Sequence, residues 1–219
     1  ALPIYDPLKD FSYISQVFIV PNILVVTPDV PAKNIQELIA LGKSKPGYLI
    51  AGHAGVGTSQ HLGGELFMSM TGVKIQQVPY RGTTAVLPDL MAGRLNIFFG
   101  NIANVLPLVR EGKLRAFGVT SRQRSPQIPD LPTMEELGFP GFDATAWFGV
   151  MAPPKTSPEI ANKLSQAIAE ALKHPDVQRR LVELSAEPVG NTPAEMAAFM
   201  KDEVERWRRV IRSAGVKVD

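Results

Sequence analysis

The chain is predicted to be an α/β protein with two lobes built from βα units. Three observations carry this prediction: strand-like and helix-like segments alternate between about Ile35 and Ser121, a glycine-rich turn joins an apolar strand to a helix, and two apolar segments flank this region. Such alternation is typical of a largely parallel sheet. Two crossover strands around one compact region predict a clamshell with a ligand site between its lobes.

The first flanking segment is Val17–Val26, which is apolar and β-branched but interrupted by Pro21. Proline cannot donate to a sheet, so we expect a strand that changes partners at this point. A helix is expected to begin after Asn34, where a glutamate three residues later completes a capping-box spacing. Tyr48–Ala51 is then predicted to be a short buried strand.

The segments that follow are assigned from their hydrophobic periodicity. The predicted strands are Ile75–Tyr80, Asn96–Gly100, Leu114–Thr120 and a second crossover, Trp147–Met151. The predicted helices begin at Thr58 or Ser59 and at Thr83, Asn104, Ser157, Asp176 and Thr192. A proline- and glycine-rich loop, Arg122–Asp143, holds one short predicted helix, Thr133–Leu137. One helix is expected to have an inward face of Leu62, Leu66, Phe67 and Met70, and another to carry Ile160, Leu164, Ile168, Ala171 and Leu172 on one apolar face.

The most informative segment is Gly52–Ser59, which we call the cradle loop. Its glycines, including Gly55 and Gly57, free the backbone for positive φ angles and for close approach of a ligand. Thr58 or Ser59 then caps a helix whose first N–H groups have no partner within the helix. Unpaired N–H groups and the positive end of a helix dipole predict an anion site, for a carboxylate or a phosphate. An ordinary strand-to-helix turn remains the alternative.

Two enzymatic interpretations of the cradle loop are weak. Its spacing imitates a phosphate-binding P-loop, but Thr58 stands where the lysine is required. Ser59 and His61 are only two residues apart on a helix, where side chains diverge, which disfavours a nucleophile and base.

Composition excludes several other classes. The chain has 219 residues, no cysteine and a net charge of only +2, so disulfides, thiolate metal sites and a basic nucleic-acid surface are not expected. His53, His61 and His174 are too scattered for a helical metal pair, and we expect each on the surface or in a loop. No metal and no cofactor is predicted, and no apolar stretch approaches the ~20 residues that span a bilayer.

Six ordered blocks of sequence carry a resemblance to a known family. They are GVGTSQHLGGELF (Gly55–Phe67), VPYRG (Val78–Gly82), DLMAGRLNIFF (Asp89–Phe99), EGKLRAFGVTS (Glu111–Ser121), LPTMEELGFPGF (Leu131–Phe142) and WFGVMAP (Trp147–Pro153). In this order they resemble the Bug, or TctC-like, solute-binding proteins of tripartite tricarboxylate transporters. The resemblance covers essentially the whole chain.

The resemblance implies a periplasmic-binding-protein type II clamshell that captures a small carboxylate in the periplasm. The ligand would be a dicarboxylate, a tricarboxylate, an aromatic carboxylate or an amino acid. The partners it implies are this ligand and the membrane subunits of the transporter, and it implies no catalytic function. A small α/β hydrolase using Ser59, and a partner-binding or sensory module that has lost transport, are the alternatives.

The resemblance also implies a division into lobes. Residues 25–143 are expected to form the second lobe, which carries the cradle loop, and residues 1–24 and 144–219 the remainder of the first lobe. Family members have an N-terminal strand and a proline- and glycine-rich loop that are absent here, so the first lobe is expected to be incomplete, by about a quarter to a third of a full-length protein. The helices from Ser157 and Thr192 would then expose apolar stripes, which an oligomer or a swapped dimer would cover.

Candidate site residues come from the resemblance and from chemistry. Two turns correspond to the turns that bind the ligand in the family. They are Gly55, Gly57, Thr58 and Ser59, and Tyr80, Arg81, Gly82 and Thr83. The Arg81 guanidinium suits a carboxylate, although an exposed loop arginine is commonly only solvated. Asn101 follows a strand's carboxyl end, where open α/β sheets place ligands. Trp147 is expected either to wall the cleft or to pack in the core.

Overall fold

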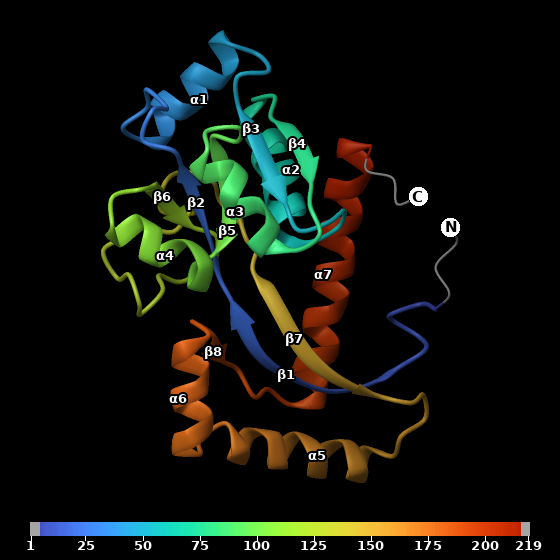
Figure 1. The fold of residues 1–219 in the computed structure, drawn as a ribbon. Helices are drawn as coiled ribbons and strands as arrows, with labels where there is room; N and C mark the ends of the chain where they lie inside the picture. The colour runs from blue at the N-terminus through green and yellow to red at the C-terminus, as the bar shows by residue number, and fades with distance from the viewer. Residues whose placement is uncertain (1–4, 216–219) are drawn as a thin grey trace. The chain divides into compact units, whose positions relative to one another are not determined.

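A computed structural model gives the structure of the chain and describes residues 5–215. The chain divides into two compact units (Figure 1). One unit contains the described residues before Pro21 together with Trp147–Arg212, and the other is formed mainly by Pro21–Ala146. The predicted α/β class is confirmed, because helices and strands alternate through most of the chain.

The unit formed by Pro21–Ala146 is built on a five-stranded sheet of order β4-β3-β5-β2-β6. Its strands are β2 (Asn22–Val26), β3 (Ile50–His53), β4 (Gln76–Pro79), β5 (Ile97–Asn101) and β6 (Arg115–Val119). Strand β3 is parallel to both β4 and β5, whereas β2 is antiparallel to its neighbours β5 and β6. The parallel arrangement expected for the stretch from about Ile35 to Ser121 is therefore confirmed for β3, β4 and β5, and β2, which precedes that stretch, is antiparallel.

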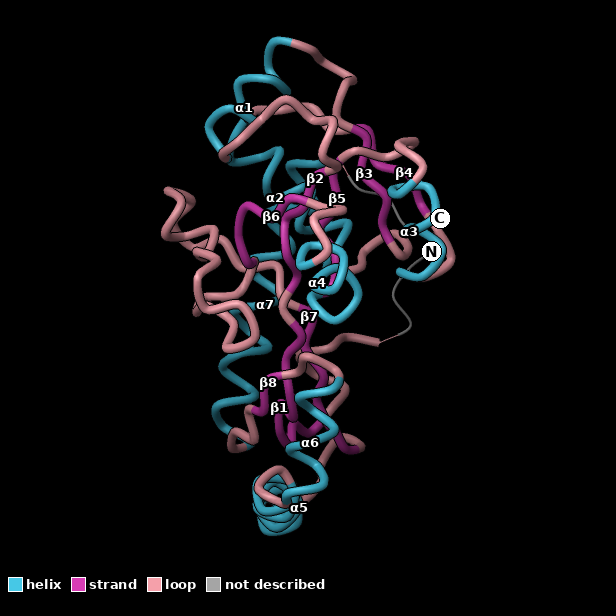
Figure 2. The backbone as a smooth tube through the Cα atoms, turned by 60° about the vertical axis from the view of Figure 1, so that its left-hand side comes forward, coloured by secondary structure: helices cyan, strands magenta, loops and turns pink. Residues whose placement is uncertain are grey.

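Four helices connect these strands, and side-chain caps explain where two of them begin. They are α1 (Ile35–Ser44), α2 (Ser59–Thr71), α3 (Thr83–Met91) and α4 (Ile102–Arg110). The Asn34 side chain accepts from the Glu37 amide at 2.8 Å, as the capping spacing predicts. The short helix predicted at Thr133–Leu137 is wrong, because that stretch forms turns, and the loop after β6 is drawn as such in Figure 2.

The predicted inward face of α2 is only partly correct. Leu62 and Phe67 are buried, but Met70 is exposed, and the polar side chains of Gln60 and His61 are buried in its place. The reason is close packing along the glycines of this helix. A Cβ added to Gly63 would lie 3.1 Å from the Cβ of Ala144, so the helix approaches its neighbours along that face.

The other unit contains a three-stranded sheet of order β7-β1-β8. Its strands are β1 (Ser12–Val20), β7 (Ala146–Ala152) and β8 (Glu187–Pro188). Pro21 separates β1 from β2, so the chain passes from one sheet to the other at the proline, as predicted. The two crossover segments are neighbours, because β7 pairs with β1.

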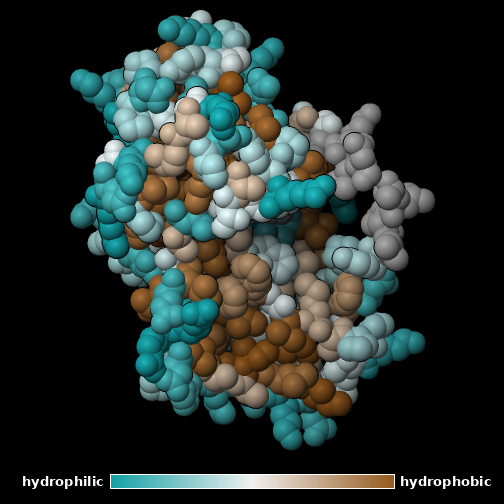
Figure 3. Space-filling view, in the orientation of Figure 1, coloured by the Kyte–Doolittle hydropathy of each residue, from teal (hydrophilic) through white to brown (hydrophobic). Residues whose placement is uncertain are grey.

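Helices α5 (Pro158–Ala171), α6 (Pro175–Glu183) and α7 (Pro193–Ala214) complete this unit. The expectation of exposed apolar stripes is confirmed for α5, where Ile160 and Leu164 are 54% and 43% exposed. Figure 3 shows apolar side chains gathered over β7 and α5. The expectation is wrong for most of α7, because Met196 and Met200 are buried; the side chain of Met196 lies against Gly149 of β7.

Candidate functional site

Polar residues gather at one edge of the five-stranded sheet. His53 is the last residue of β3, and Asn101 is the last residue of its parallel neighbour β5. Asn22, the first residue of the antiparallel strand β2, pairs directly with Asn101. The carboxyl ends of β3 and β5 and the amino end of β2 therefore meet at the edge where open α/β sheets bind ligands.

The cradle loop follows β3 at this edge and has the backbone that its glycines predict. Gly55 has a φ of +139° and Gly57 a φ of +81°, both in a region that disfavours any side chain. Thr58 is the N-cap of α2: its hydroxyl donates to the Gly55 carbonyl at 2.8 Å and accepts from the amide of His61 at 3.4 Å. The expectation of a capped helix start is confirmed for Thr58.

A network of neutral side chains joins the cradle loop to the strand ends. The Asn22 amide donates to the Ser59 hydroxyl at 3.1 Å, and the Asn101 amide donates to the Asn22 side-chain oxygen at 2.7 Å. Gln60 is the centre of this network, because its oxygen accepts from the Ala54 amide at 2.9 Å. Its nitrogen donates to the hydroxyl of Thr83 at 2.7 Å and to Asn101 at 3.2 Å.

This network brings together the N-termini of three helices, α2, α3 and α4. Helix α3 begins after Gly82 (φ +92°), which has no side chain to cap it, and the Asn101 side chain that precedes α4 makes no capping hydrogen bond either. Uncapped first turns leave backbone N–H groups for another acceptor, and helix dipoles favour an anionic one. The arrangement suits a carboxylate held by neutral donors.

In the turn at residues 80–83, one side chain makes a structural contact, one is exposed and one belongs to the polar network. The hydroxyl of Tyr80 donates to Asp89 at 2.6 Å, and this hydrogen bond raises the pKa of Tyr80 and lowers that of Asp89. This hydrogen bond therefore links the turn to α3. Arg81 is exposed at the same turn, and the Thr83 hydroxyl belongs to the Gln60 network.

The expectation that all three histidines lie on the surface or in loops is wrong for two of them. His53 and His61 are only 2% and 7% exposed, and their rings lie 4.4 Å apart beneath the cradle loop. His53 ends a buried strand and His61 lies in the first turn of α2, so the packing of α2 against the sheet buries both. Burial lowers the pKa of each imidazole.

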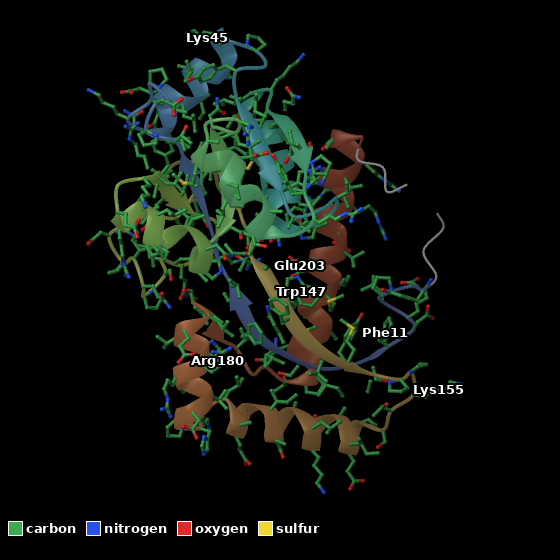
Figure 4. The ribbon with its side chains drawn as sticks, in the orientation of Figure 1. Phe11, Lys45, Trp147, Lys155, Arg180 and Glu203 are labelled. Atoms are coloured by element: carbon green, nitrogen blue, oxygen red, sulfur yellow. The ribbon has the colours of Figure 1, made fainter. Side chains whose placement is uncertain are left out.

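Trp147 lies in the other unit, and its indole is used in a core contact. Its N–H donates to Glu203 at 3.0 Å, and both residues are labelled in Figure 4. Its ring packs edge-on against Phe199, with 5.2 Å between the ring centroids. Glu203 is buried, and it also accepts from the indole of Trp207 and pairs with Arg206. Of the two expectations for Trp147, these contacts correspond to core packing.

Sequence reasoning missed Asn22, Gln60 and the buried histidines. The signals were present but weak. Asn22 is a polar residue between Pro21 and the apolar run that becomes β2, and Gln60 directly follows the capped start of α2. The local sequence at neither position predicts a hydrogen-bond partner, because the partners are distant in sequence.

The geometry offers hydrogen-bond donors to a small anion and does not arrange a serine and a histidine for catalysis. The Ser59 hydroxyl accepts from Asn22, while His61 Nδ1 accepts from the Gly57 amide, so this histidine is not placed as a base for this serine. Among residues 5–215 no group of three or more histidine, aspartate or glutamate side chains is arranged for a metal ion. Within the same range no helix is both long enough and apolar enough to cross a membrane.

The chain is an α/β protein of two units in which strand ends and helix N-termini converge on one polar network. The chain belongs to the tripartite tricarboxylate transporter family receptors (TctC), whose family model matches residues 2–216. It is 38% identical to Protein BugT of Bordetella pertussis over 214 residues, which are 98% of this chain and 66% of BugT. The chain thus spans somewhat less than two thirds of the length of that relative.

Solved structures have the same fold. The chain is similar to R. palustris Rpa4515 with adipate, with 37% identity and a TM-score of 0.81 over 96% of this chain and 71% of that one. It is also similar to MatC from Rhodopseudomonas palustris with bound malate, with 32% identity and a TM-score of 0.80 over 96% of this chain and 73% of that one. The periplasmic binding protein BugD gives a TM-score of 0.81 at 32% identity. The predicted resemblance and the fold class of periplasmic binding proteins are therefore confirmed.

Proposed function

We propose that this protein is an extracytoplasmic solute-binding protein that captures a small carboxylate at the edge of the five-stranded sheet. It delivers this ligand to the membrane subunits of a tripartite tricarboxylate-type transporter. The observation that carries the proposal is the convergence of three helix N-termini, two of them without a side-chain cap, on one network of neutral amides and hydroxyls. Such a site supplies hydrogen-bond donors to an anion without any reacting group.

The proposed ligand contacts are the backbone and hydroxyl donors of the cradle loop and of the turn before α3. In the cradle Ser59 supplies its amide and hydroxyl, whereas Gly55, Gly57 and Thr58 shape the loop around the ligand, because their own donors are used within the loop. Around the turn the contacts are Arg81, Gly82, Thr83 and Asn101. Each neutral donor contributes ~1 kcal/mol, and somewhat more because the acceptor is charged. Tyr80 is proposed to act by holding α3, because its hydroxyl is bonded to Asp89.

Dicarboxylates are the first ligands to test. The similar proteins Rpa4515 and MatC carry adipate and malate in their structures, and we propose the same class of ligand here. Family membership supports a periplasmic location, and the exposed apolar face of α5 supports a role for further chain or a second copy in covering it. The domain assignment of residues 25–143 to a ligand-cradle lobe is part of the same proposal.

The test compares two glycines with similar backbones. Gly57 and Gly47 have φ angles of +81° and +86°, and an added Cβ at either meets nothing within 4 Å. Gly57→Ala and Gly47→Ala should therefore each cost about 1 kcal/mol of unfolding free energy through backbone strain alone. Gly47 precedes β3 and so lies toward the opposite end of that strand from the cradle loop.

Calorimetric titration with adipate and malate should show weakened binding for Gly57→Ala and unchanged binding for Gly47→Ala. Ser59→Ala should have a smaller effect than Gly57→Ala, since Ser59 supplies one hydroxyl. Equal affinities for both glycine variants would contradict the proposed site. A turnover abolished by Ser59→Ala would favour the hydrolase, and a wild-type protein that binds none of the carboxylates would favour a partner-binding or sensory role.

A further inference from the structure

Two buried histidines lie directly beneath the cradle loop and take part in its backbone hydrogen bonding. The Gly55 amide donates to Nδ1 of His53 at 3.3 Å, and the Gly57 amide donates to Nδ1 of His61 at 3.1 Å. The two rings lie 4.4 Å apart with 33° between their planes. Both glycines of the cradle with positive φ are thus tied to an imidazole.

These hydrogen bonds require a particular protonation state. An imidazole nitrogen accepts a hydrogen bond only through a free lone pair, so Nδ1 is unprotonated and the proton of the neutral ring lies on Nε2. A cationic imidazole carries N–H at both nitrogens and has no acceptor to offer. Protonation of either ring therefore places two donors against each other and removes one of the loop's backbone contacts.

The surroundings favour the neutral pair. Burial is the main cause that lowers the pKa of each ring from 6.5, and for His53 repulsion from His61 lowers it further. Glu65 on α2 faces the pair, with its Oε1 3.6 Å from Nε2 of His61, and the Gln77 amide of β4 donates to that same oxygen at 2.8 Å. Burial also raises the pKa of Glu65, which weakens its support for a cation.

Two other charged side chains lie near this face, Arg81 at the turn before α3, which is exposed, and Asp89. Asp89 on α3 accepts from Tyr80 and pairs with Arg94. Gln60, which also supports the loop at Ala54, is neutral. Of the titratable groups at this face, the two histidines are the ones that accept hydrogen bonds from the amides of the cradle loop.

We propose that His53 and His61 are positioning residues of the carboxylate site: their neutral Nδ1 atoms hold the Gly55 and Gly57 amides in the binding geometry, and protonation of the pair loosens the loop and releases the ligand. This inference rests on the proposed function. It has a definite sign, because simple attraction between a histidine cation and a carboxylate would strengthen binding on acidification. Loss of the loop geometry, in contrast, weakens ligand binding on acidification.

The sign follows from the depressed pKa values. A histidine whose pKa is lower in the ordered loop than in the opened loop stabilises the ordered form above pH 6.5. That stabilisation is lost as the pH falls through the lowered pKa. Affinity should therefore be constant near pH 8 and decline on acidification below about 6.5.

Substitutions can separate the two properties of these imidazoles, namely that Nδ1 accepts a hydrogen bond and that the ring titrates. Asparagine places an oxygen close to the position of Nδ1 and does not titrate, so His53→Asn and His61→Asn keep an acceptor for the loop. His61→Phe keeps the ring but removes the acceptor. His174 is the matched control, because its Nδ1 also accepts a backbone amide, that of Asp176, at an exposed helix cap in the other unit.

Adipate and malate should be titrated by calorimetry from pH 8 to pH 5.5. The wild type and His174→Asn should weaken by about tenfold, the scale of one or two lost hydrogen bonds. The double variant His53→Asn, His61→Asn should keep most of its affinity and show a flatter profile, whereas His61→Phe should bind weakly throughout. The carboxylates' own titration is common to all variants and cancels in the comparison. An asparagine double variant with the wild-type profile, or a wild type that binds more tightly at low pH, would overturn the proposal.

A ligand-free measurement distinguishes failure of this inference from failure of the proposed function. Imidazole ¹⁵N shifts should show both Nδ1 atoms unprotonated at pH 8, and the amide signals of Gly55 and Gly57 should shift at the same midpoint as the rings. If no carboxylate binds at any pH, the proposed function fails, while these shifts still test the histidine contacts. Protonated Nδ1 atoms at pH 8 would disprove the contacts, whatever the ligand does.

Discussion

Replacement of Gln60 by methionine tests the network that joins the three helix starts. The side chain is 3% exposed, and its three hydrogen bonds reach Ala54, Thr83 and Asn101. Methionine has a similar length and flexibility but carries no donor or strong acceptor. The variant therefore removes the hydrogen bonds with little change in packing.

The expected cost follows from the number and exposure of the lost bonds. Each buried hydrogen bond contributes roughly 0.5–1.5 kcal/mol net, so three give between about 1.5 and 4.5 kcal/mol. The partner groups on Ala54, Thr83 and Asn101 are only partly buried, and water can replace part of what is lost. We expect a loss of about 2 kcal/mol of unfolding free energy, with weaker carboxylate binding.

Urea denaturation followed by circular dichroism measures the stability, and native-state hydrogen exchange of the Ala54 amide reports the local contact. Gln178→Met is the control, because Gln178 donates one hydrogen bond to the Leu172 carbonyl in the other unit. Gln178→Met should lose less unfolding free energy than Gln60→Met and should leave the ligand affinity unchanged. A Gln60→Met protein with wild-type stability, or with unaltered Ala54 protection, would refute the bridging role of this amide.

Two further substitutions test the packing of each unit. Gly52→Ala should cost about 1–3 kcal/mol by overpacking, since the added Cβ would lie 2.6 Å from Val86 and 2.8 Å from Leu95; calorimetric unfolding measures this, and an unchanged melting temperature would contradict the close approach. Glu203→Leu should cost roughly 3 kcal/mol, because two indole N–H groups and a partly buried arginine lose their shared carboxylate. Tryptophan fluorescence during denaturation reports the second change directly, and wild-type stability would show that the carboxylate is dispensable.

Local sequence was sufficient for the features that depend on neighbouring residues. Asn34, Thr58 and Ser157 cap the helices that their spacing predicts, because a cap and its amide partner are only three residues apart. Pro21 separates two strands because it lacks a donor, and Gly55 and Gly57 adopt the positive φ angles that other residues avoid.

Some predictions failed where local pattern and tertiary packing disagree. The periodicity of α2 predicts an apolar face that includes Met70, yet close approach along Gly63 and Gly64 buries Gln60 and His61 instead. The sequence made no prediction of the direction of β2, which is antiparallel to β5 and β6. Hydrophobic pattern reports burial, whereas parallel or antiparallel pairing depends on which distant strand lies alongside.

The sequence by itself determined the α/β class, the family resemblance, the glycine cradle and the starts of the capped helices. Only the tertiary structure decided which side chains support that cradle. Asn22 meets Asn101 across 79 positions of sequence, and Gln60 meets Asn101 across 41. Caps and turns arise from interactions between near neighbours in the chain, but a buried polar network exists only when folding brings every donor to its acceptor, because each group left without one destabilises the fold.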